Sequence, residues 1–259
     1  MNENIKLYQG DCLEVMDKLI AEGVKVDTII TDPPYGTTAC KWDSIIPFDK
    51  MWERLNKLIK PNGAIVLFGS EPFSSALRMS NIKNFKYDWV WNKKKHANAM
   101  LAKIQPLKIH ELVHIFSSNG KANYYPIKEK RNPRVDKESN IKNGDNFGGK
   151  IVKRKYSNPE GLYNPKSILE ISNANQKGKV HPTQKPIPLM EYLIKTYTNE
   201  GELVLDFTMG SFTTAIACLN TKRRFIGIEL DDGYFEIGTK RVNEHLKTLD
   251  YTPKICYNV

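Results

Sequence analysis

The sequence is poor in the features that mark membrane, secreted and metal-binding chains. No apolar run in it approaches the roughly 18 residues that a membrane-spanning helix needs. Its first residues lack the basic and then apolar pattern of a secretory signal. Its four cysteines lie far apart and form no CxxC pair, which argues against a zinc site and against a disulfide framework. We therefore expect a cytoplasmic protein with reduced thiols, no metal and no membrane contact.

Charge is distributed unevenly along the 259 residues. The formal net charge is +10, a value found in nucleic-acid-binding proteins and also in proteins that are merely soluble. Residues 119–180 contain 14 of the 39 Lys and Arg residues but only 6 of the 29 Asp and Glu residues. This segment is also rich in Asn, Gly, Ser and Pro and has little periodicity, so we expect a loop-rich insertion or a small irregular lobe.

Strand and helix patterns alternate on both sides of that segment. Short apolar runs predict strands at 5–8, 26–31, 64–68, 87–91, 112–116, 203–206 and 225–229. Helical spacing of apolar residues predicts helices at 13–21, 49–60, 72–79, 187–197, 213–219 and 232–247, with Pro-Asn-Gly at 61–63 ending the second of them. This alternation predicts an α/β fold with a mostly parallel twisted sheet and helices on both faces. Ligands of such sheets bind at the carboxyl ends of strands, near the switch point.

The first candidate site is Asp32-Pro33-Pro34-Tyr35, directly after the strand predicted at 26–31. Two prolines fix φ and remove two backbone donors, so the turn presents a carboxylate and carbonyls that only accept hydrogen bonds. Acceptors beside an aromatic ring suit a group with two N–H donors on a flat ring, namely the exocyclic amine of a nucleobase. The tetrapeptide also occurs as an ordinary turn, but its place at a strand end favours a function.

The second candidate site is the segment 206–214, Asp-Phe-Thr-Met-Gly-Ser-Phe-Thr-Thr, again between a strand and a helix. Gly210 allows the backbone to approach a ligand closely, and the helix N-terminus can hold the carboxylate of an amino-acid-like cofactor. Glu229 ends the next strand, where an acid can accept hydrogen bonds from ribose hydroxyls. Capping of the helix by Ser211 and Thr213 explains the same residues without a ligand.

Together these motifs resemble the β-class of amino-DNA methyltransferases, from Gly10 to about Arg241. That class places its catalytic motif first, a target-recognition segment next and its cofactor motif late, and 32–35, 119–180 and 206–214 follow this order. Four further stretches are similar to the class: Gly10-Asp11-Cys12, Trp91-Asn92-Lys93 with His110-Glu111, His181-Pro182-Thr183-Gln184-Lys185-Pro186, and residues 225–231.

The resemblance implies a Rossmann-like methyltransferase fold, S-adenosylmethionine as cofactor and double-stranded DNA as partner. Residues 1–118 would be the catalytic half of the domain, 119–180 the target-recognition insertion and 181–259 the cofactor-binding half. The site-specific reaction would methylate the N6 amine of a flipped adenine. Asp32 and the Pro33 carbonyl would hold that amine, with Pro34 in the same turn and Tyr35 stacked on the base.

The resemblance also assigns the cofactor contacts. Asp11, with Cys12 in the same turn, would reach the cofactor adenine, and Glu229 would bind ribose. The methionine part would be held by Lys185 and by the turn that contains Asp206, Phe207, Thr208, Gly210, Ser211 and Thr213. Asp32 is expected among the cofactor contacts as well. The family usually has Gly-Ser-Gly at the core of this turn, whereas Phe212 replaces the second glycine here. Because a bulky side chain does not easily take φ > 0, we expect either a turn without positive φ at this position or weaker cofactor binding.

Basic residues in and near the insertion are the candidates for contacts to phosphates or guanine edges. They are Lys93, Lys94, Lys95, Arg131, Arg134, Lys153, Arg154 and Lys155. Each of them taken singly can also be a solvated surface charge.

Other functions remain open at this point. By resemblance, Asp at the first position of the Asp32–Tyr35 motif favours adenine as the target base. The alternatives are N4-cytosine methylation and a catalytically weak DNA-binding homologue. A dinucleotide-dependent oxidoreductase is disfavoured because no GxGxxG follows the first strand. The resemblance also raises a homodimer and a cognate restriction enzyme as partners to test.

Overall fold

The computed structural model describes residues 4–38, 43–96, 98–142, 151–173 and 184–258, with the backbone alone for 135–142, 151–156 and 258. It divides the chain into two compact units, residues 1–125 with 167–259 and residues 126–166. None of the helices in these ranges is long and apolar enough to cross a membrane.

A nine-stranded sheet forms the centre of the larger unit, in the order β10-β4-β5-β3-β2-β11-β12-β1-β13. Only β5 runs antiparallel to its neighbours, β3 and β4, among these strands. The strands are β1 (Ile5–Gln9), β2 (Val26–Thr31), β3 (Ile59–Gly69), β4 (Phe85–Asn92), β5 (His110–Phe116), β10 (Ile168–Glu170), β11 (Leu203–Asp206), β12 (Arg224–Glu229) and β13 (Ile255–Asn258).

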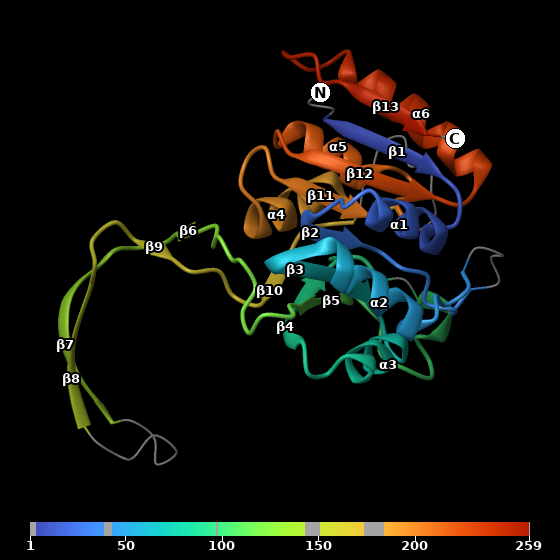
Figure 1. Ribbon diagram of the computed structural model, residues 1–259. Coiled ribbons are helices and arrows are strands. Elements are labelled where there is room, and N and C mark those ends of the chain that lie inside the picture. The colour runs from blue at the N-terminus through green and yellow to red at the C-terminus, as the bar shows by residue number, and fades with distance from the viewer. Residues whose placement is uncertain (1–3, 39–42, 97, 143–150, 174–183, 259) are drawn as a thin grey trace. The chain divides into compact units, whose positions relative to one another are not determined.

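Helices cover both faces of this sheet (Figure 1). One hydrophobic cluster joins it to α1 (Cys12–Ala21), α2 (Phe48–Leu58) and α3 (Phe73–Ser80). A second cluster joins it to α4 (Ile187–Tyr197), α5 (Thr213–Asn220) and α6 (Asp232–Leu246). In α2, for example, Met51, Trp52, Leu55 and Leu58 recur at helical spacing and are all buried. The predicted α/β fold is confirmed.

The switch point of the sheet lies between β2 and β11. From β2 the chain passes through α2 to β3 on one side, and from β11 it passes through α5 to β12 on the other. The two strands are parallel neighbours, with Leu205 opposite Ile29. Their carboxyl ends, Thr31 and Asp206, therefore meet at the edge where open α/β sheets bind ligands.

One predicted turn is part of a strand instead. Pro61-Asn62-Gly63 was expected to separate a helix from a strand, but β3 already begins at Ile59 and runs through these residues. Asn62 has φ +63°, and the pairing of β3 with β2 shifts register at this point. A Cβ on Gly63 would lie 2.8 Å from the Asp27 carbonyl oxygen, so the irregular strand start depends on a residue without a side chain.

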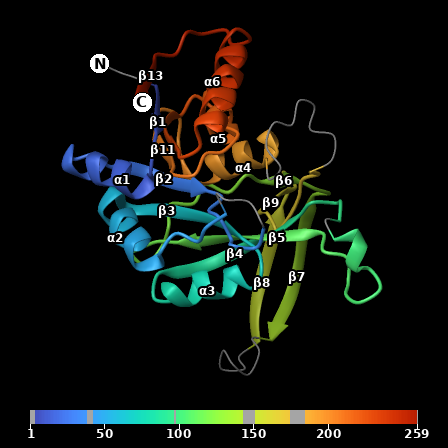
Figure 2. The same ribbon diagram turned by 90° about the vertical axis from the view of Figure 1, so that its right-hand side faces the viewer.

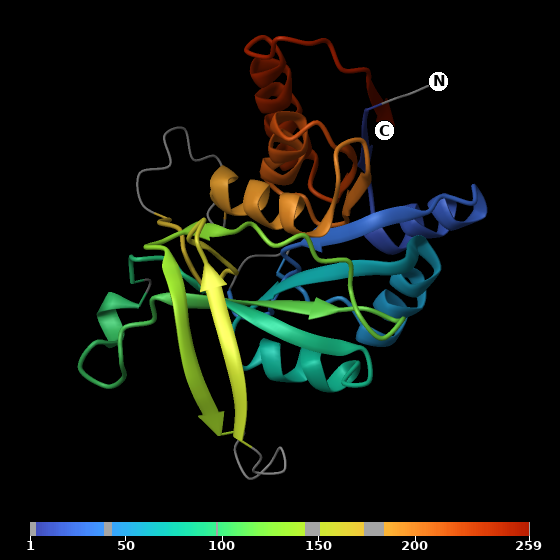
Figure 3. The same ribbon diagram turned by 90° about the vertical axis from the view of Figure 1, so that its left-hand side faces the viewer.

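The smaller unit contains two antiparallel pairs of strands. β6 (Glu129–Lys130) pairs with β9 (Leu162–Tyr163), and β7 (Arg134–Lys142) pairs with β8 (Ile151–Asn158) as a long hairpin (Figure 3). The expectation of irregular structure is wrong for these residues. The strands were not predicted because the β7–β8 hairpin has a mostly polar sequence, without the apolar alternation that predicts strands. The smaller unit also spans fewer residues than the predicted insertion at 119–180. At one end, the Tyr125 backbone N–H donates to the Thr196 carbonyl in the larger unit. At the other end, β10 joins the large sheet.

Candidate active site

The two predicted site segments meet at the switch point. Thr31 donates a hydrogen bond to Asp206 Oδ1 at 2.6 Å, which joins the end of β2 to the end of β11. Thr208 Oγ1 lies 2.6 Å from Thr31 Oγ1 and donates to the main-chain carbonyl of Asp32 at 3.1 Å. The turn after β2 and the turn after β11 are therefore bonded directly to each other.

Both turns line one cavity of about 650 Å³. The early turn at Asp11, the end of β12 at Glu229 and Lys185 before α4 also line it. Every residue predicted for catalysis or for the cofactor lies on this cavity: Asp11, Cys12, Asp32, Pro33, Pro34, Tyr35, Lys185, Asp206, Phe207, Thr208, Gly210, Ser211, Thr213 and Glu229. The structure brings these residues together, and their individual roles remain predictions.

Asp32 is held by hydrogen bonds to both of its carboxylate oxygens. The hydroxyl of Tyr35 donates to Oδ1 at 2.6 Å, and the ammonium of Lys185 donates to Oδ2. Burial raises the pKa of Asp32, and the charge of Lys185 opposes that rise. The Tyr35 ring stacks on Phe73 of α3 at a centroid distance of 5.0 Å, which supports the ring from one side.

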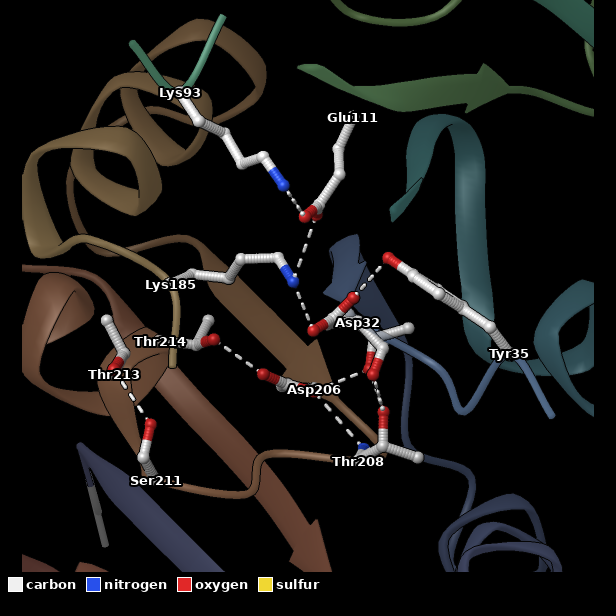
Figure 4. Close-up of polar contacts among 11 residues, drawn as sticks. Asp32, Tyr35, Lys93, Glu111, Lys185, Asp206, Thr208, Ser211, Thr213 and Thr214 are labelled. Carbon is white, nitrogen blue, oxygen red and sulfur yellow. Dashed lines mark hydrogen bonds and ion pairs between the residues drawn. The ribbon is translucent and has the colours of Figure 1, made fainter. Parts of the chain in front are cut away.

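A line of alternating charges extends from Asp32 into the sheet (Figure 4). Lys185 Nζ lies 3.3 Å from Glu111 Oε2, and Lys93 Nζ donates to Glu111 Oε1 at 3.0 Å. The side chains of both lysines are only 8% exposed, so solvent screens these pairs weakly. Burial alone would raise the pKa of Glu111, but the two ammonium groups lower it. Burial alone would lower the pKa of Lys185, but the two carboxylates raise it.

The turn after β11 is tied by hydroxyl and backbone donors. Asp206 accepts from Thr31, from Thr214 Oγ1 at 2.5 Å and from the Thr208 backbone N–H at 3.1 Å. Burial nevertheless raises the pKa of Asp206 to about 6. Gly210, at φ +49°, donates its N–H to Glu229 Oε2 at 2.8 Å, so the turn also fixes the carboxylate at the end of β12.

Phe212 departs from the family pattern in a way that the structure explains. Its φ is +58°, so a bulky residue does take the left-handed conformation here, which excludes the first of our two expectations and leaves weaker cofactor binding as a prediction. The ring is fully buried, and it packs edge-on against Phe235 of α6 at a centroid distance of 5.6 Å. A Cβ on Gly238 of α6 would lie 2.3 Å from this ring. Gly238 therefore leaves the space that the ring fills, and burial offsets the backbone strain.

The predicted DNA contacts have different surroundings. Lys93 does not support a phosphate contact, because its side chain is buried and bonded to Glu111. Lys94 pairs with Glu170 at 3.0 Å, whereas Lys95 is exposed at the cavity. Arg131, which bonds to Glu129, and the exposed Arg134 belong to the 126–166 unit. The side chains of Lys153, Arg154 and Lys155, and all of His181, Pro182 and Thr183, lie outside the described part of the chain.

Two residues of the site were not predicted as such. Glu111 joins Lys93 and Lys185, and the only sequence signal for it was the match of His110-Glu111 to a middle strand. Asp43 accepts backbone hydrogen bonds from Gly36, Thr37 and Thr38 at 2.7–2.9 Å and so fixes the loop that follows Tyr35. These bonds lower the pKa of Asp43 although its burial opposes that change. No local pattern marked this acid.

A nine-stranded sheet with one reversed strand, and a cavity at its switch point lined by both turns, define the class of Rossmann-like methyltransferases. Comparison with known proteins gives the family. The family model described as DNA methylase, covering N6 and N4 methyltransferases, matches residues 26–240, and the chain belongs to this family.

Several relatives match most of the chain. It is 29% identical to the type II methyltransferase M1.MboII of Moraxella bovis over 90% of this chain and 95% of that protein. It is 25% identical to the DNA adenine methyltransferase YhdJ of Escherichia coli K12 over 93% of this chain and 84% of that protein. Among solved structures, the complex of M1.HpyAVI with S-adenosylmethionine (SAM) has a TM-score of 0.64 and 28% identity, covering 92% of this chain and 99% of that chain. The resemblance noted in the sequence is confirmed.

Proposed function

We propose that this chain transfers a methyl group from SAM to the N6 amine of an adenine flipped out of double-stranded DNA. The observation that carries this proposal is the direct bonding of the acceptor turn at Asp32 to the turn at Asp206 across one cavity. The relatives support the substrate, since one of them is a DNA adenine methyltransferase and another a type II methyltransferase.

The chemistry of the cavity lining fits SAM, which carries a net positive charge. In a chain of net charge +10, the lining holds six carboxyl groups and only three lysines. Two of the carboxyl groups, on Asp206 and Glu229, are buried, so a cation beside them would gain more than it would in water. When bound, the cofactor supplies an electrophilic methyl group on its sulfonium.

The residues that would hold the cofactor follow from their places on the cavity. Glu229 would accept hydrogen bonds from the ribose hydroxyls, and Asp11, with Cys12 beside it, would reach the adenine ring. The turn from Asp206 to Thr213 would surround the methionine part. Because Phe212 packs into the core against α6, its bulk does not occupy the space that this turn encloses.

The catalytic turn would act by positioning the target amine. The amine nitrogen is a poor nucleophile because its lone pair is delocalised into the ring. Hydrogen bonds from its two N–H groups to Asp32 and to the Pro33 carbonyl would favour a pyramidal nitrogen whose lone pair faces the methyl group. Such positioning can contribute about 7–11 kcal/mol. Tyr35, supported by Phe73, would stack on the flipped base, and Asp32 would accept the proton that the amine loses.

Lys185 has a supporting part in this scheme. Its ammonium bonds to Asp32 and pairs with Glu111, and Glu111 is itself held by a hydrogen bond from Lys93. Burial raises the pKa of Asp32, and the positive charge of Lys185 opposes that rise by favouring the ionised form. In this scheme it is the ionised carboxylate that accepts from the amine.

The direct test is to identify the methylated base. The purified chain would be incubated with SAM carrying a labelled methyl group and with unmethylated DNA, and the DNA would be digested to nucleosides and analysed by mass. We expect label in N6-methyladenine. Label in N4-methylcytosine would show that the target base is cytosine and not adenine. DNA without label would refute the proposed methyl transfer. Sequencing that reports modified bases would give the recognition sequence of an active enzyme.

Three parts of the wider prediction remain predictions. They are a homodimer, a cognate restriction enzyme and a cytoplasmic location. Size-exclusion chromatography with light scattering would test the first of them, and the genes beside the one for this chain would test the second.

A further inference from the structure

Residues 94–96 and 98–109, between β4 and β5, carry apolar side chains on their surface; we call them the apolar loop. Met100 is 99% exposed and Ile104 79% exposed, the highest values among the large apolar residues that the structure describes. Leu101, Leu107 and Ile109 of the same loop are also exposed. Single exposed apolar residues are common, but five on one short loop mark an interaction surface.

The apolar loop has a defined local structure. The 3₁₀ helix η1 (Ala99–Leu101) is followed by a turn in which Ile104 and Gln105 donate backbone hydrogen bonds to the Leu101 carbonyl, both at 3.0 Å. Asn98 ties the two sides together, because its side chain donates to the Pro106 carbonyl at 3.1 Å and accepts from the Lys108 N–H at 2.6 Å. A tip that is ordered in this way would lose less entropy when it binds a partner.

The base of the loop lies at the catalytic cavity. The Lys93 N–H donates to the Ile109 carbonyl at 2.8 Å, which closes the loop where β4 and β5 pair. Lys95 and His96, at its start, line the cavity together with Asp32. The tip extends away from the sheet beyond these residues, as the green segment between β4 and β5 in Figure 2.

The charge of this segment favours a nucleic acid as its partner. The sequence from Lys93 to His110 contains five lysines, two histidines and no acidic residue. Lys93 and Lys94 have carboxylate partners, but Lys95 and Lys103 are exposed on the loop. Apolar side chains flanked by lysines match a base stack flanked by phosphates better than they match a protein surface.

A flipped adenine leaves a gap in the duplex. Flipping costs a few kcal/mol, so the base tends to return to the stack unless a side chain fills the gap. Proteins that distort duplexes insert Met, Ile, Leu or Phe between base steps. The apolar loop presents two such residues on a hydrogen-bonded tip, and the base of the loop lines the cavity that would take the flipped base.

We propose that the apolar loop inserts Met100 and Ile104 into the DNA duplex beside the target adenine and holds the duplex open while the base occupies the cavity. Lys95 and Lys103 contact the flanking phosphates. This inference rests on the proposed function, and it assigns the opening of the duplex to a segment separate from both catalytic turns and from the 126–166 unit.

The test compares the Met100→Ala/Ile104→Ala variant with wild type on two short unmethylated duplexes. Both carry the sequence that the wild-type enzyme methylates. One duplex is fully paired, and the other has an abasic position opposite the target adenine. On the paired duplex we expect kcat/KM to fall about 10–100-fold, because flipping must then proceed without the wedge. On the duplex with the unpaired target the loss should be at most about threefold, because that base is already freed from its partner.

The matched control is Met79→Ala/Ile82→Ala, which removes two other exposed apolar side chains, 71% and 56% exposed, near the end of α3. It should leave both rates unchanged. Lys103→Ala should weaken binding to both duplexes equally and reduce the salt dependence by about one phosphate contact.

Equal rates for wild type and the loop variant on the paired duplex would overturn the inference, and so would equal losses on the two duplexes. A change of oligomeric state in the variant would show that the loop binds a second copy of the chain instead. If wild type transferred no methyl group to either DNA, the proposed function would fail. Anisotropy binding would still test the loop in that case, since the loop variant should lose more affinity for the paired duplex than for the abasic one, and equal losses would overturn the inference.

Discussion

The turns at 32–35 and 206–213 face each other across one cavity, but they are held by different means. The first is stiffened by two prolines and anchored by charge, through Tyr35, Lys185 and Glu111. The second is held by threonine hydroxyls around Asp206 and by Phe212, which takes φ +58° with its ring buried against α6. Local sequence thus stiffens the backbone of the first turn, whereas the charges that anchor it and the packing that holds the second turn come from residues far along the chain.

This difference suits the two tasks that we assign to the turns. A group that must orient a reactive amine gains from a rigid backbone and a fixed charge. A turn that must surround a larger cofactor gains from backbone N–H groups and a glycine. Each of the following experiments disturbs one of the two turns and measures the task that we assign to it or its stability.

The largest expected effect among the experiments on how the turns are held comes from removing the charge beside the first turn. In Lys185→Met, Asp32 loses the ammonium that favours its ionised form, so its pKa, which burial already raises, should rise further. The acid limb of the pH–rate profile should shift to higher pH, and kcat at neutral pH should fall about 10²–10³-fold, as for loss of a preorganised charge contact.

Lys95→Met, which removes an exposed lysine from the same cavity, is the matched control: it should raise KM for DNA through the lost phosphate contact but leave the pH profile of kcat in place. Lys185→Arg, which keeps the charge, should recover part of the rate. A Lys185→Met enzyme with the wild-type profile would mean that the charge network has no part in catalysis.

The second experiment disturbs the packing that holds the cofactor turn. In Gly238→Ala the new methyl group would meet the Phe212 ring, so we expect a loss of about 1–3 kcal/mol in the free energy of unfolding. In an ordinary helix the same change would stabilise by about 1 kcal/mol.

A double-mutant cycle identifies the cause of that loss. In the background of Phe212→Gly, which restores the glycine that the family has at this position, Gly238→Ala should no longer destabilise, because the ring that it meets is gone. Denaturant unfolding of the four proteins gives the coupling. Equal losses in both backgrounds would show that the pair does not support the turn.

The smallest expected effect concerns the pH dependence of cofactor affinity. The pKa of Asp206 is raised to about 6, so the carboxyl group is neutral below that pH and attracts a cation less. The Kd for SAM should therefore be constant above about pH 7 and should rise by up to about tenfold per unit below the pKa. Calorimetric titrations across this range would measure it.

Asp206→Asn should bind more weakly at neutral pH and should lose the slope. A slope that persists in this variant would assign the dependence to another group. A wild-type Kd that did not change with pH would contradict the assignment of Asp206 to the cofactor site.

Much of the fold could be predicted from the sequence, because periodic apolar residues determine both element type and burial. The bounds of β2, α4 and β11 agree with the prediction. The strand through Pro61-Asn62-Gly63 could not be predicted, because it depends on the fit of Gly63 against Asp27 in a neighbouring strand. The β7–β8 hairpin lacks the apolar alternation that marks a strand.

The site shows the same division. Asp32, Asp206 and Glu229 each end a predicted strand, so their meeting follows from the parallel sheet. The pairings of Glu111 with Lys185 and of Phe212 with Gly238 join residues that are far apart in the sequence, and no local pattern indicates them. A single sequence shows which residues end strands, but it does not show which partners the folded chain places beside them.

The central claim is that Asp32 orients the target amine within a site that binds cofactor and DNA independently of it. Asp32→Asn keeps the shape of the side chain but replaces an accepting oxygen by a donating NH₂ group. We predict that labelled methyl transfer to DNA falls by at least about 10³-fold, while the affinities for SAM and for DNA stay within about threefold of wild type. Transfer by Asp32→Asn at the wild-type rate would contradict the account.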